Sequence, residues 1–434
     1  MGKIICRKNL KRCCVSMLND LVSDLEQYKK IAIFGYGVEG RSFHAFAEKY
    51  LPDVAISIVD KNYADDDNYL DGLREAELIV KSPGISLHTL GIDYDAYNFT
   101  SITELFLKHF GSQIIGVTGT KGKSTLVTLI DSMLKNAGRK SLLCGNIGIS
   151  PLQAIETIDE ETTVVMELSS HQLHHVNHSP HIAVLTNLFP EHLDYYEDLA
   201  DYYEAKFNIF RHQNARDIFI YNLQNPNNYF DTEKAPSKHT YNVFANELKN
   251  EVQFNIKNGY IHHATLQILE KLAEILEIDE STFMKTVTTF QTLPHRLEFV
   301  DEIDGVSYIN DSISTIPQAS MEAMKILKNV DTIILGGYDR GVDYSELVNF
   351  LRESNVKNII CFSDTGKQIY EKINEEENNK HLFYMHDLRE SVKKAGECAR
   401  EIVLFSPAAS SFNSYKNFAE RGEEFKSLVN NLKG

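Results

Sequence analysis

The chain has 434 residues, more than one ordinary domain needs, and we expect three domains. Hydrophobic residues at 43% and charged residues at 24% are typical of a compact folded protein, and a formal net charge of −17 argues against binding to nucleic acid through clustered lysine and arginine. The basic amino-terminal segment lacks the apolar stretch of a secretory signal, and no run approaches about 18 uninterrupted apolar residues, which predicts a cytoplasmic protein with no membrane insertion.

The first α/β segment is predicted near residues 28–105. An apolar strand in "KKIAIF" leads through "GYGVEG" (35–40) into a helical pattern, and "AISIVD" adds a strand that ends in Asp60. This order matches a dinucleotide fingerprint, in which glycines admit a phosphate and the acid binds a ribose hydroxyl. A further strand, in "AELIVKSPGIS", ends in a turn at 82–84. On its own, the fingerprint would allow an NAD-binding protein.

A second α/β segment is predicted to begin near residue 111, where "SQIIGVTGTKGKST" gives a strand, a glycine loop and a helix opened by Ser124. The glycines would let backbone amides converge on a phosphate, Lys123 would add positive charge and Ser124 could ligate Mg²⁺. The spacing from Gly116 is one residue longer than in a strict P-loop, and a plain tight turn is the alternative. With ATP bound here, the "GYGVEG" loop is predicted to hold a nucleotide that is not a redox cofactor.

The remaining sequence continues the α/β pattern. Strands in "TTVVMELSS", "IAVLTNL" and "DIFIYN" end in polar residues, where an open α/β sheet binds its ligands. After "LPHRLEFV", strands in "VSYIND", "DTIILGG", "KNIICFS" and "EIVLFSP" alternate with helical stretches. We therefore predict an α/β protein with three domains in series: a Rossmann-like domain at 1–110, a P-loop ATPase-like domain at 111–297 and a second Rossmann-like domain at 298–434.

Eight motifs occur in an order that resembles the Mur ligases, and the last is most similar to the glutamate-adding branch of that family. The match leaves out about the first 25 residues and the polar segment at 225–258. The motifs are "GVTGTKGKST" (116–125), "GNIG" (145–148), "ELSSHQL" (167–173), "NLFPEHLD" (187–194), "AKFNIF" (205–210), "LPHRLE" (293–298), "YINDS" (308–312) and "SPAASSFNSYKNFAERGEEF" (406–425).

The resemblance implies the three-domain Mur ligase fold and a monomeric, cytoplasmic ligase of peptidoglycan synthesis, and thus a role in cell-wall biogenesis, cell shape and cell division. Such an enzyme joins D-glutamate to UDP-N-acetylmuramoyl-L-alanine while ATP, with Mg²⁺, becomes ADP and phosphate. A carboxylate is a poor acyl donor, so the acid is first converted to an acyl phosphate, and the enzyme supplies positioning and positive charge. The first domain would bind the UDP-sugar, the central domain ATP and the third domain glutamate.

The resemblance also assigns residues to ATP, to Mg²⁺ and to catalysis. Glu167 could otherwise be a surface acid or a helix cap, His192 a structural histidine and Lys206 an exposed helix lysine. The residues predicted to contact ATP are Gly119, Thr120, Lys121, Gly122, Lys123, Ser124, Thr125, Arg296 and Asp311. The predicted catalytic residues are Lys123, Glu167, His192 and Lys206, and the predicted metal ligands are Ser124, Glu167, His192 and Lys206 as its carbamate.

The two other substrates receive their own sets of residues by the same resemblance. Arg340 suits a dicarboxylate because its planar guanidinium can bind a carboxylate through two hydrogen bonds. The residues predicted to contact the UDP-sugar are Gly37, Asp60, Ser82, Asn146 and Ser169. Those predicted to contact glutamate are Thr315, Arg340, Ser411 and Phe418.

The sequence departs from the family pattern in two places. Ile313 and Arg340 stand where lysine is usual in the enzymes that add D-glutamate, so addition of L-glutamate is the main alternative. His262 and Thr265 stand where two asparagines usually lie near the adenine, which leaves the adenine contacts open. A folylpolyglutamate synthase-like ligase and an NAD-binding protein that is not a ligase are the more distant alternatives.

Overall fold

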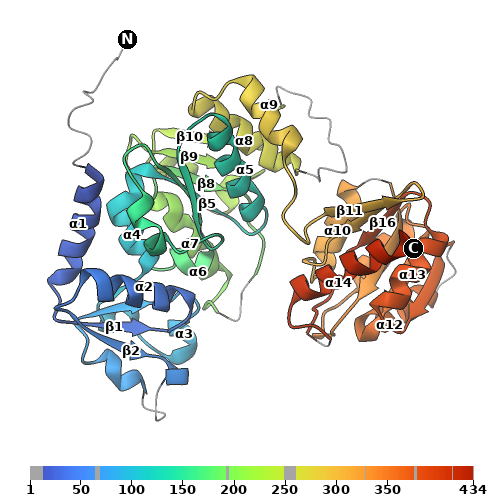
Figure 1. Ribbon diagram of the computed structural model, residues 1–434, viewed down its shortest axis with the longest axis horizontal. Coiled ribbons are helices and arrows are strands. Elements are labelled where there is room, and N and C mark those ends of the chain that lie inside the picture. Colours follow the sequence, from blue (N-terminus) through green and yellow to red (C-terminus); the bar gives the residue numbers. More distant parts are fainter. Residues whose placement is uncertain are drawn as a thin grey trace. The chain divides into compact units, whose positions relative to one another are not determined.

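The computed structural model describes residues 13–63, 69–191, 195–248, 261–327, 329–375, 379–412 and 414–433. The chain divides into two compact units: unit 1 comprises Met1–Glu251 and His263–Thr286, and unit 2 comprises Val252–His262 and Val287–Gly434. Two sheets lie in unit 1 and one in unit 2, and helices alternate with largely parallel strands (Figure 1). The α/β class is confirmed, while the domain boundaries near residues 110 and 297 stay predictions.

The first sheet of unit 1 is parallel, with the strand order β2-β1-β3-β4. Ile31 and Ile33 pack into one hydrophobic cluster and Ala32 and Phe34 into another, so β1 is buried on both faces, as parallel strands usually are. The strands are β1 (Lys30–Phe34), β2 (Ala55–Val59), β3 (Leu78–Lys81) and β4 (Phe99–Thr100). The helices are α1 (Cys13–Glu26), α2 (Val38–Tyr50), α3 (Leu87–Leu90) and α4 (Ile102–Phe110).

The second sheet of unit 1 is parallel, with the order β10-β9-β8-β5-β7-β6, so β5 lies between β8 and β7. One hydrophobic cluster continues from the first sheet through α4 into this sheet, which accounts for a single compact unit. The strands are β5 (Ile114–Thr118), β6 (Ser141–Gly145), β7 (Thr163–Glu167), β8 (Ile182–Leu185), β9 (Ile218–Tyr221) and β10 (His239–Asn242). The helices are α5 (Lys123–Asn136), α6 (Ser170–Leu173), α7 (Leu199–Arg211), α8 (His263–Ile275) and α9 (Glu280–Thr289).

Unit 2 contains the third sheet, with the order β11-β12-β16-β13-β14-β15. Only the β11–β12 pair in this sheet is antiparallel. The strands are β11 (Glu298–Ile303), β12 (Val306–Asn310), β13 (Val330–Gly336), β14 (Asn358–Phe362), β15 (His381–Met385) and β16 (Ile402–Phe405). The helices are α10 (Pro317–Ile326), α11 (Ser345–Glu353), α12 (Ser363–Asn374), α13 (Leu388–Cys398) and α14 (Phe418–Asn430).

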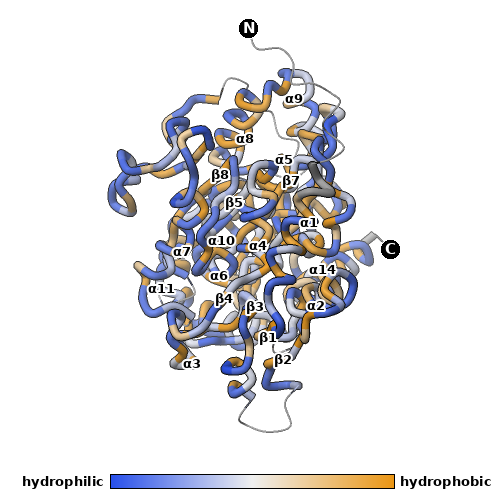
Figure 2. The backbone as a smooth tube through the Cα atoms, turned by 90° about the vertical axis from the view of Figure 1, so that its left-hand side faces the viewer, coloured by the Kyte–Doolittle hydropathy of each residue, from blue (hydrophilic) through white to orange (hydrophobic). Residues whose placement is uncertain are grey.

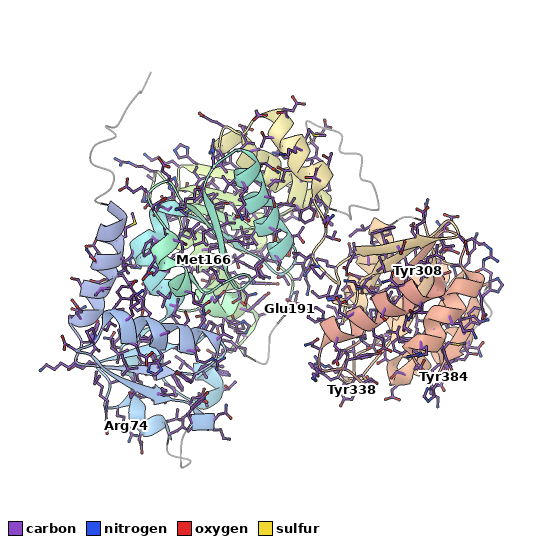
Figure 3. All side chains as sticks on the ribbon, viewed as in Figure 1. Arg74, Met166, Glu191, Tyr308, Tyr338 and Tyr384 are labelled. Atoms are coloured by element: carbon purple, nitrogen blue, oxygen red, sulfur yellow. The ribbon has the colours of Figure 1, made fainter. Side chains whose placement is uncertain are left out.

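The apolar residues are concentrated on strands and on the inner faces of helices. Met166 on β7 and Tyr308 on β12 are buried, whereas Tyr338 and Tyr384 are exposed (Figure 3). Hydrophobic residues run along α8 (Figure 2), whose Leu266, Leu269 and Leu272 side chains are buried. Over the described parts of the chain, no helix combines the length and apolar character needed to cross a membrane. Short 3-10 helices lie at Lys61–Tyr63, Tyr69–Leu73, Tyr94–Ala96, Gly111–Gln113, Pro151–Gln153, Ile155–Thr157, Pro226–Asn228, Thr232–Lys234 and Asn431–Lys433.

Candidate active site

The predicted phosphate loop lies between β5, a central strand, and α5. Gly119 has a φ of 137° and Gly122 a φ of 83°, which residues with a side chain rarely adopt. A Cβ atom on Gly119 would lie 2.0 Å from Thr186 Oγ1, so the loop can pack against the end of β8 only with glycine there. The local geometry is therefore a strand, a glycine loop and a helix amino terminus, which is a site suited to anions.

Residues after β8 hold this loop in place. Asn187 Oδ1 accepts a hydrogen bond from the Lys121 amide at 2.8 Å, and Thr186 Oγ1 donates to the Lys121 carbonyl at 2.8 Å. The Thr120 amide donates to the Asn187 carbonyl at 3.0 Å. The sequence analysis did not assign Thr186 or Asn187, although their position directly after a buried strand was a usable signal.

Two lysines converge on one oxygen of the loop. Lys123 Nζ and Lys206 Nζ donate to the Gly119 carbonyl at 2.9 and 3.0 Å. Lys206 is 2% exposed, so the alternative of an exposed helix lysine is wrong. Burial, aided by the positive charge of Lys123, holds the pKa of Lys206 well below its usual range. A larger share of its amine is therefore neutral near pH 7 than for a solvated lysine.

Glu167 lies at the carboxyl end of β7, opposite Val117 of β5. It is 1% exposed, so it is not a surface acid, and α6 is instead capped by Ser169. Its Oε1 accepts from Asn146 Nδ2 at 2.9 Å. Its Oε2 is buried and has no hydrogen-bond partner among the described residues. A buried carboxylate oxygen without a donor fits an oxygen-seeking cation such as Mg²⁺.

Ser124 and His192 are the other residues predicted to bind a metal. Ser124 is half-buried in the first turn of α5, and its carbonyl accepts from Thr128 Oγ1 at 2.8 Å. His192 lies outside the described residues. Within the described ranges, no three or more histidine, cysteine, aspartate or glutamate side chains form a group that could hold a metal. The protein ligands for Mg²⁺ would therefore include Ser124 and Glu167, beside oxygens of the nucleotide.

Thr125 and Thr265 complete the surroundings of the phosphate loop. Thr125 is half-buried in the first turn of α5. Thr265 of α8 is buried, and its Oγ1 lies 3.8 Å from the position of a Cβ on Gly122. One of the two positions where asparagine was expected thus borders the loop itself. His262 is exposed.

The "GYGVEG" loop has the tight geometry predicted for it. Gly35 has a φ of 92°, and a Cβ on Gly40 would lie 2.2 Å from the Gly35 carbonyl oxygen. Asp60 holds the loop, because its Oδ2 accepts from the Tyr36 amide at 2.7 Å and its Oδ1 from the Asn62 amide at 2.8 Å. The carboxylate of Asp60 therefore has an internal role beside any contact with a ribose.

The other residues predicted to contact the UDP-sugar lie near this loop or near Glu167. Ser82 Oγ donates to the Gly35 carbonyl at 2.6 Å, and Gly37 is the exposed residue that precedes α2. Asn146 contacts Glu167, and Ser169 Oγ accepts from the Gln172 amide at 3.2 Å as a helix cap. Ser82, Asn146 and Ser169 are thus each hydrogen-bonded to another residue of unit 1.

Two charged residues of this region were not assigned from the sequence: Glu39 belongs to the "GYGVEG" segment itself, and Lys81 is the last residue of β3. Lys81 Nζ donates to the Ile85 carbonyl at 3.0 Å, and burial lowers its pKa to about 8. Glu39 Oε1 accepts from Gln172 Nε2 at 2.9 Å, and burial raises the pKa of Glu39. Neither residue follows a sequence pattern that signals burial, because charged residues are usually exposed.

Arg296 and Asp311 lie in unit 2. Asp311 is buried at the end of β12, where its Oδ1 accepts from the Leu297 amide at 3.2 Å and its Oδ2 from Ser406 Oγ at 2.8 Å. Burial raises the pKa of Asp311 to about 6, although the positive charge of Arg296 opposes this shift. Asp311 thus fixes the segment that carries Arg296. The Arg296 Nε atom is buried without a hydrogen-bond partner in the described part of the chain.

The residues predicted to contact glutamate lie in unit 2, in segments that follow the carboxyl ends of β12, β13 and β16. Arg340 is exposed, and its Cζ lies 5.1 Å from the centre of the Phe412 ring, next to buried Ser411. The carbonyl of Phe418, the first residue of α14, accepts from Ser312 Oγ at 2.8 Å. Thr315 is half-buried between β12 and α10.

Arg421 organises these loops and was not assigned from the sequence. It is fully buried, and its guanidinium donates to the carbonyls of Ala409 at 3.0 Å, Ser410 at 3.1 Å and Ser312 at 2.9 Å. Its Nε donates to Ser312 Oγ at 3.1 Å. No carboxylate forms an ion pair with Arg421 among the described residues, and burial lowers its pKa to about 10. One cation therefore ties together the segments around residues 312 and 410.

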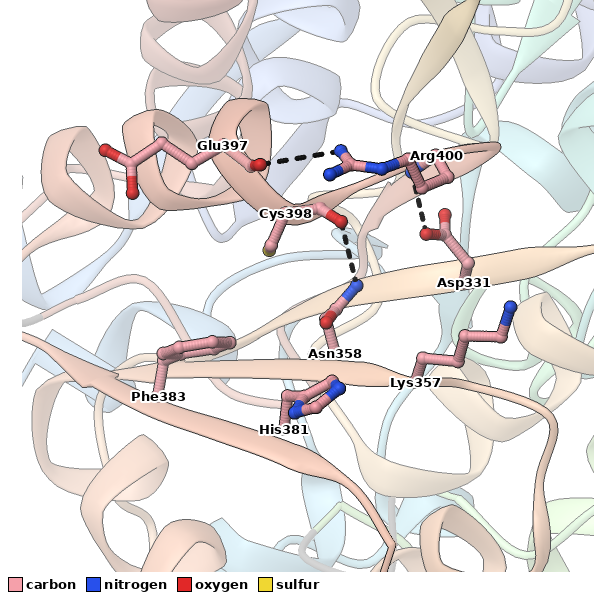
Figure 4. Close-up of a pocket in the computed structure, with 8 residues that line it drawn as sticks. All are labelled: Asp331, Lys357, Asn358, His381, Phe383, Glu397, Cys398 and Arg400. Atoms are coloured by element: carbon pink, nitrogen blue, oxygen red, sulfur yellow. Dashed lines mark hydrogen bonds between the residues drawn. The ribbon is translucent and has the colours of Figure 1, made fainter.

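A hollow of about 320 Å³ lies at the opposite end of the same sheet (Figure 4). Lys357, His381 and Arg400 line it at the amino ends of the strands. Asp331 in its wall accepts from the Arg400 amide at 2.8 Å, and Asn358 Nδ2 donates to the Cys398 carbonyl at 3.4 Å. Since α/β sheets bind ligands beyond the carboxyl ends of their strands, this hollow is not the candidate site.

The chain matches two protein-family models. Residues 117–284 match the Mur ligase middle domain, and residues 295–409 match the Mur ligase glutamate ligase domain. The first match covers the phosphate loop, Glu167 and Lys206, and the second covers Arg296, Asp311 and Arg340. The segments around residues 35–82 in unit 1 and 410–421 in unit 2 lie outside these two matches.

Similar proteins extend this finding to nearly the whole chain. A UDP-N-acetylmuramoylalanine–D-glutamate ligase from Acetivibrio thermocellus is 32% identical over 96% of this chain and 99% of its own. A ligase of the same name from Clostridium acetobutylicum is 31% identical over 93% of this chain and 97% of its own. MurF from Acinetobacter baumannii has a similar fold, with a TM-score of 0.61 and 13% identity over 95% of this chain and 98% of its own.

Proposed function

Because this chain belongs to the Mur ligase family, we propose that it joins D-glutamate to UDP-N-acetylmuramoyl-L-alanine in peptidoglycan precursor synthesis, with ATP as the energy source. The names of the relatives support this substrate pair, and their similarity extends over almost the full chain. The observation that carries the ATP-dependent step is the convergence of Lys123 and Lys206 on the Gly119 carbonyl of the phosphate loop.

The proposed chemistry proceeds in two steps. An oxygen of the substrate carboxylate attacks the γ-phosphorus of ATP, ADP leaves, and an acyl phosphate forms. The amine of glutamate then attacks the acyl carbon, and the departing phosphate retains the oxygen that came from the carboxylate. Both steps depend on holding the reacting atoms in line and on neutralising negative charge.

In this account, Lys123 contacts the β- and γ-phosphates of ATP. Its Nζ already lies against the loop carbonyls of Gly119 and Thr120, so a short side-chain rotation would turn it toward a phosphate. The amides of the phosphate loop and the amino terminus of α5 would contact the same anion. Removing Lys123 should therefore weaken ATP binding and the transfer step together.

Mg²⁺, when bound, would neutralise the phosphate charge, and the unpartnered Oε2 of Glu167 supports a place for it. Ser124 would hold this ion together with Glu167, whereas His192, with Lys206 if it carries a carbamate, would hold a second Mg²⁺. The neutral amine that burial favours at Lys206 is the form that reacts with carbon dioxide. Asn146, which donates to Glu167 Oε1, would orient the carboxylate.

D-glutamate is proposed over L-glutamate because the named relatives use the D form. Ile313 and Arg340 remain as departures in the part of unit 2 proposed to bind the amino acid. Arg340, Ser411, Phe418 and Thr315 would bind glutamate, while Gly37, Asp60 and Ser82 would lie toward the UDP part of the other substrate. The cytoplasmic location and the monomeric state stay predictions.

The test is an assay of phosphate release with UDP-N-acetylmuramoyl-L-alanine, ATP, Mg²⁺ and either enantiomer of glutamate. We expect turnover with D-glutamate, little with L-glutamate, and a loss of at least about 100-fold in Lys123→Ala. Turnover with L-glutamate alone would overturn the proposed substrate. Turnover with neither, by protein that binds ATP, would overturn the proposed reaction.

A further inference from the structure

Two loops of unit 2 are paired so closely that they position two particular side chains. The Tyr338 amide donates to the Ser410 carbonyl at 2.8 Å, which joins the loop after β13 to the loop after β16. A Cβ on Gly337, whose φ is 156°, would lie 2.3 Å from the same carbonyl oxygen. Glycine is therefore required at this contact, and the pairing fixes the backbones that carry Arg340 and Phe412.

Phe412 is an exposed aromatic residue in this pair of loops. Its side chain is 60% exposed although it directly follows Ser411, which is buried. The guanidinium of Arg340 lies over its ring, with 5.1 Å between Cζ and the ring centre. This geometry is that of a cation–π contact, which attracts the cation to the face of the ring. The ring therefore gives Arg340 a defined position that an isolated surface arginine lacks.

The hydrogen-bonding groups of Arg340 remain available in this position. No acid forms an ion pair with Arg340 over the part of unit 2 that the structure describes. Its neighbour Asp339 is engaged elsewhere, since Oδ1 accepts from the Gly341 amide at 2.8 Å and Oδ2 from Gln368 Nε2 at 2.8 Å. The contact with the ring face does not use the N–H donors of the guanidinium, so they can still bind a carboxylate in pairs.

We propose that Phe412 is a positioning residue that holds the Arg340 guanidinium to receive a carboxylate group of the incoming glutamate. The inference rests on the proposed function and extends it to a residue that the family resemblance does not assign. It also gives a reason for Arg340 where lysine is usual, because a guanidinium can contact a ring face and still offer a pair of N–H donors to one carboxylate.

The experiment is a double-mutant cycle on the KM for glutamate, with kcat and the KM for ATP measured in parallel. Phe412→Leu should raise the KM for glutamate about two- to fivefold with kcat nearly unchanged. Phe412→Tyr, which keeps an aromatic ring, should retain the wild-type KM. In an Arg340→Met background, Phe412→Leu should have no further effect, because the contact is already lost. Tyr384→Leu, which removes another exposed aromatic side chain of unit 2, is the matched control and should change neither the KM for glutamate nor kcat.

The outcomes separate the inference from the proposed function. Equal effects of Phe412→Leu with and without Arg340 would overturn the inference and leave the proposed function standing, as would an unchanged KM in Phe412→Leu. Wild-type protein that releases no phosphate with either enantiomer of glutamate would overturn both. Thermal unfolding of each variant serves to confirm that a changed KM does not come from misfolded protein.

Discussion

Lys206 Nζ lies 3.0 Å from the carbonyl oxygen of Gly119, so a buried amine on α7 contacts the phosphate loop that begins after β5. The same oxygen accepts from Lys123 Nζ, and the two positive charges disfavour one another. Burial and this repulsion both favour the neutral amine of Lys206. The fold therefore favours a neutral Lys206 amine, which can be modified or can lie beside the negative charges of a nucleotide.

The lowered pKa of Lys206 predicts carbamate formation near neutral pH. With ¹³C-bicarbonate at pH 7 to 8, wild-type protein should show a carbamate carbonyl signal in NMR spectra, because the amine reacts only when it is neutral. Lys206→Arg should lose the signal and at least about 100-fold in activity. Lys135→Arg, at an exposed helix lysine paired with Asp131, should lose neither. Full activity of Lys206→Arg would contradict the prediction.

Gly119→Ala should abolish binding of ATP. The new Cβ would lie 2.0 Å from Thr186 Oγ1, and the alanine would have to adopt a φ of 137°, which is strained for a residue with a side chain. The loop must therefore move. Gly138→Ala is a matched control, since Gly138 also has a positive φ, of 69°, but nothing lies within 4 Å of its Cβ position. Calorimetric titration with ATP and Mg²⁺ should detect binding to the control and not to Gly119→Ala. Equal affinities would show that the loop is not the nucleotide site.

The phosphate loop could be predicted from the sequence because its strand, its glycines and Lys123 all lie within one short continuous segment. The three α/β segments followed in the same way from strands that end in polar residues. The burial of Lys206, Lys81 and Arg421 could not be predicted, because it depends on which elements pack around each lysine or arginine. Asp60 illustrates the same limit, since its pattern predicted a ribose contact while the fold also uses both of its oxygens to hold the loop.

Asp311→Asn should change how the stability of unit 2 depends on pH. The pKa of Asp311 is raised to about 6 from 3.8, so the folded state binds a proton that the unfolded state releases between these values. Asp311 by itself should therefore lower the free energy of unfolding by about 3 kcal/mol as the pH rises from below 4 to above 6, and the variant should lack this contribution. Urea unfolding at pH 4 and pH 7.5 measures the difference in the free energy of unfolding between wild-type protein and Asp311→Asn. A difference that does not depend on pH would contradict the raised pKa.

Arg421→Met should destabilise the loops around residues 312 and 410. It leaves the buried carbonyls of Ala409, Ser410 and Ser312 without these donors, at a cost of about 3 kcal/mol or more. Hydrogen exchange of peptides that contain these residues should accelerate, whereas the phosphate loop in unit 1 should be unaffected. Arg389→Met, at an exposed position of α13, should change exchange little. Unchanged protection in Arg421→Met would show that the loops are held by other contacts.

The most direct test of the central claim follows one oxygen atom. UDP-N-acetylmuramoyl-L-alanine with an ¹⁸O-labelled carboxylate is incubated with the protein, ATP, Mg²⁺ and D-glutamate, and the released phosphate is analysed by mass spectrometry. If the carboxylate attacks the γ-phosphorus of ATP held by the phosphate loop, each phosphate released with the ligated product carries one ¹⁸O. Ligated product accompanied by unlabelled phosphate would contradict the acyl phosphate, and with it the account of what the loop, Lys123 and Lys206 do.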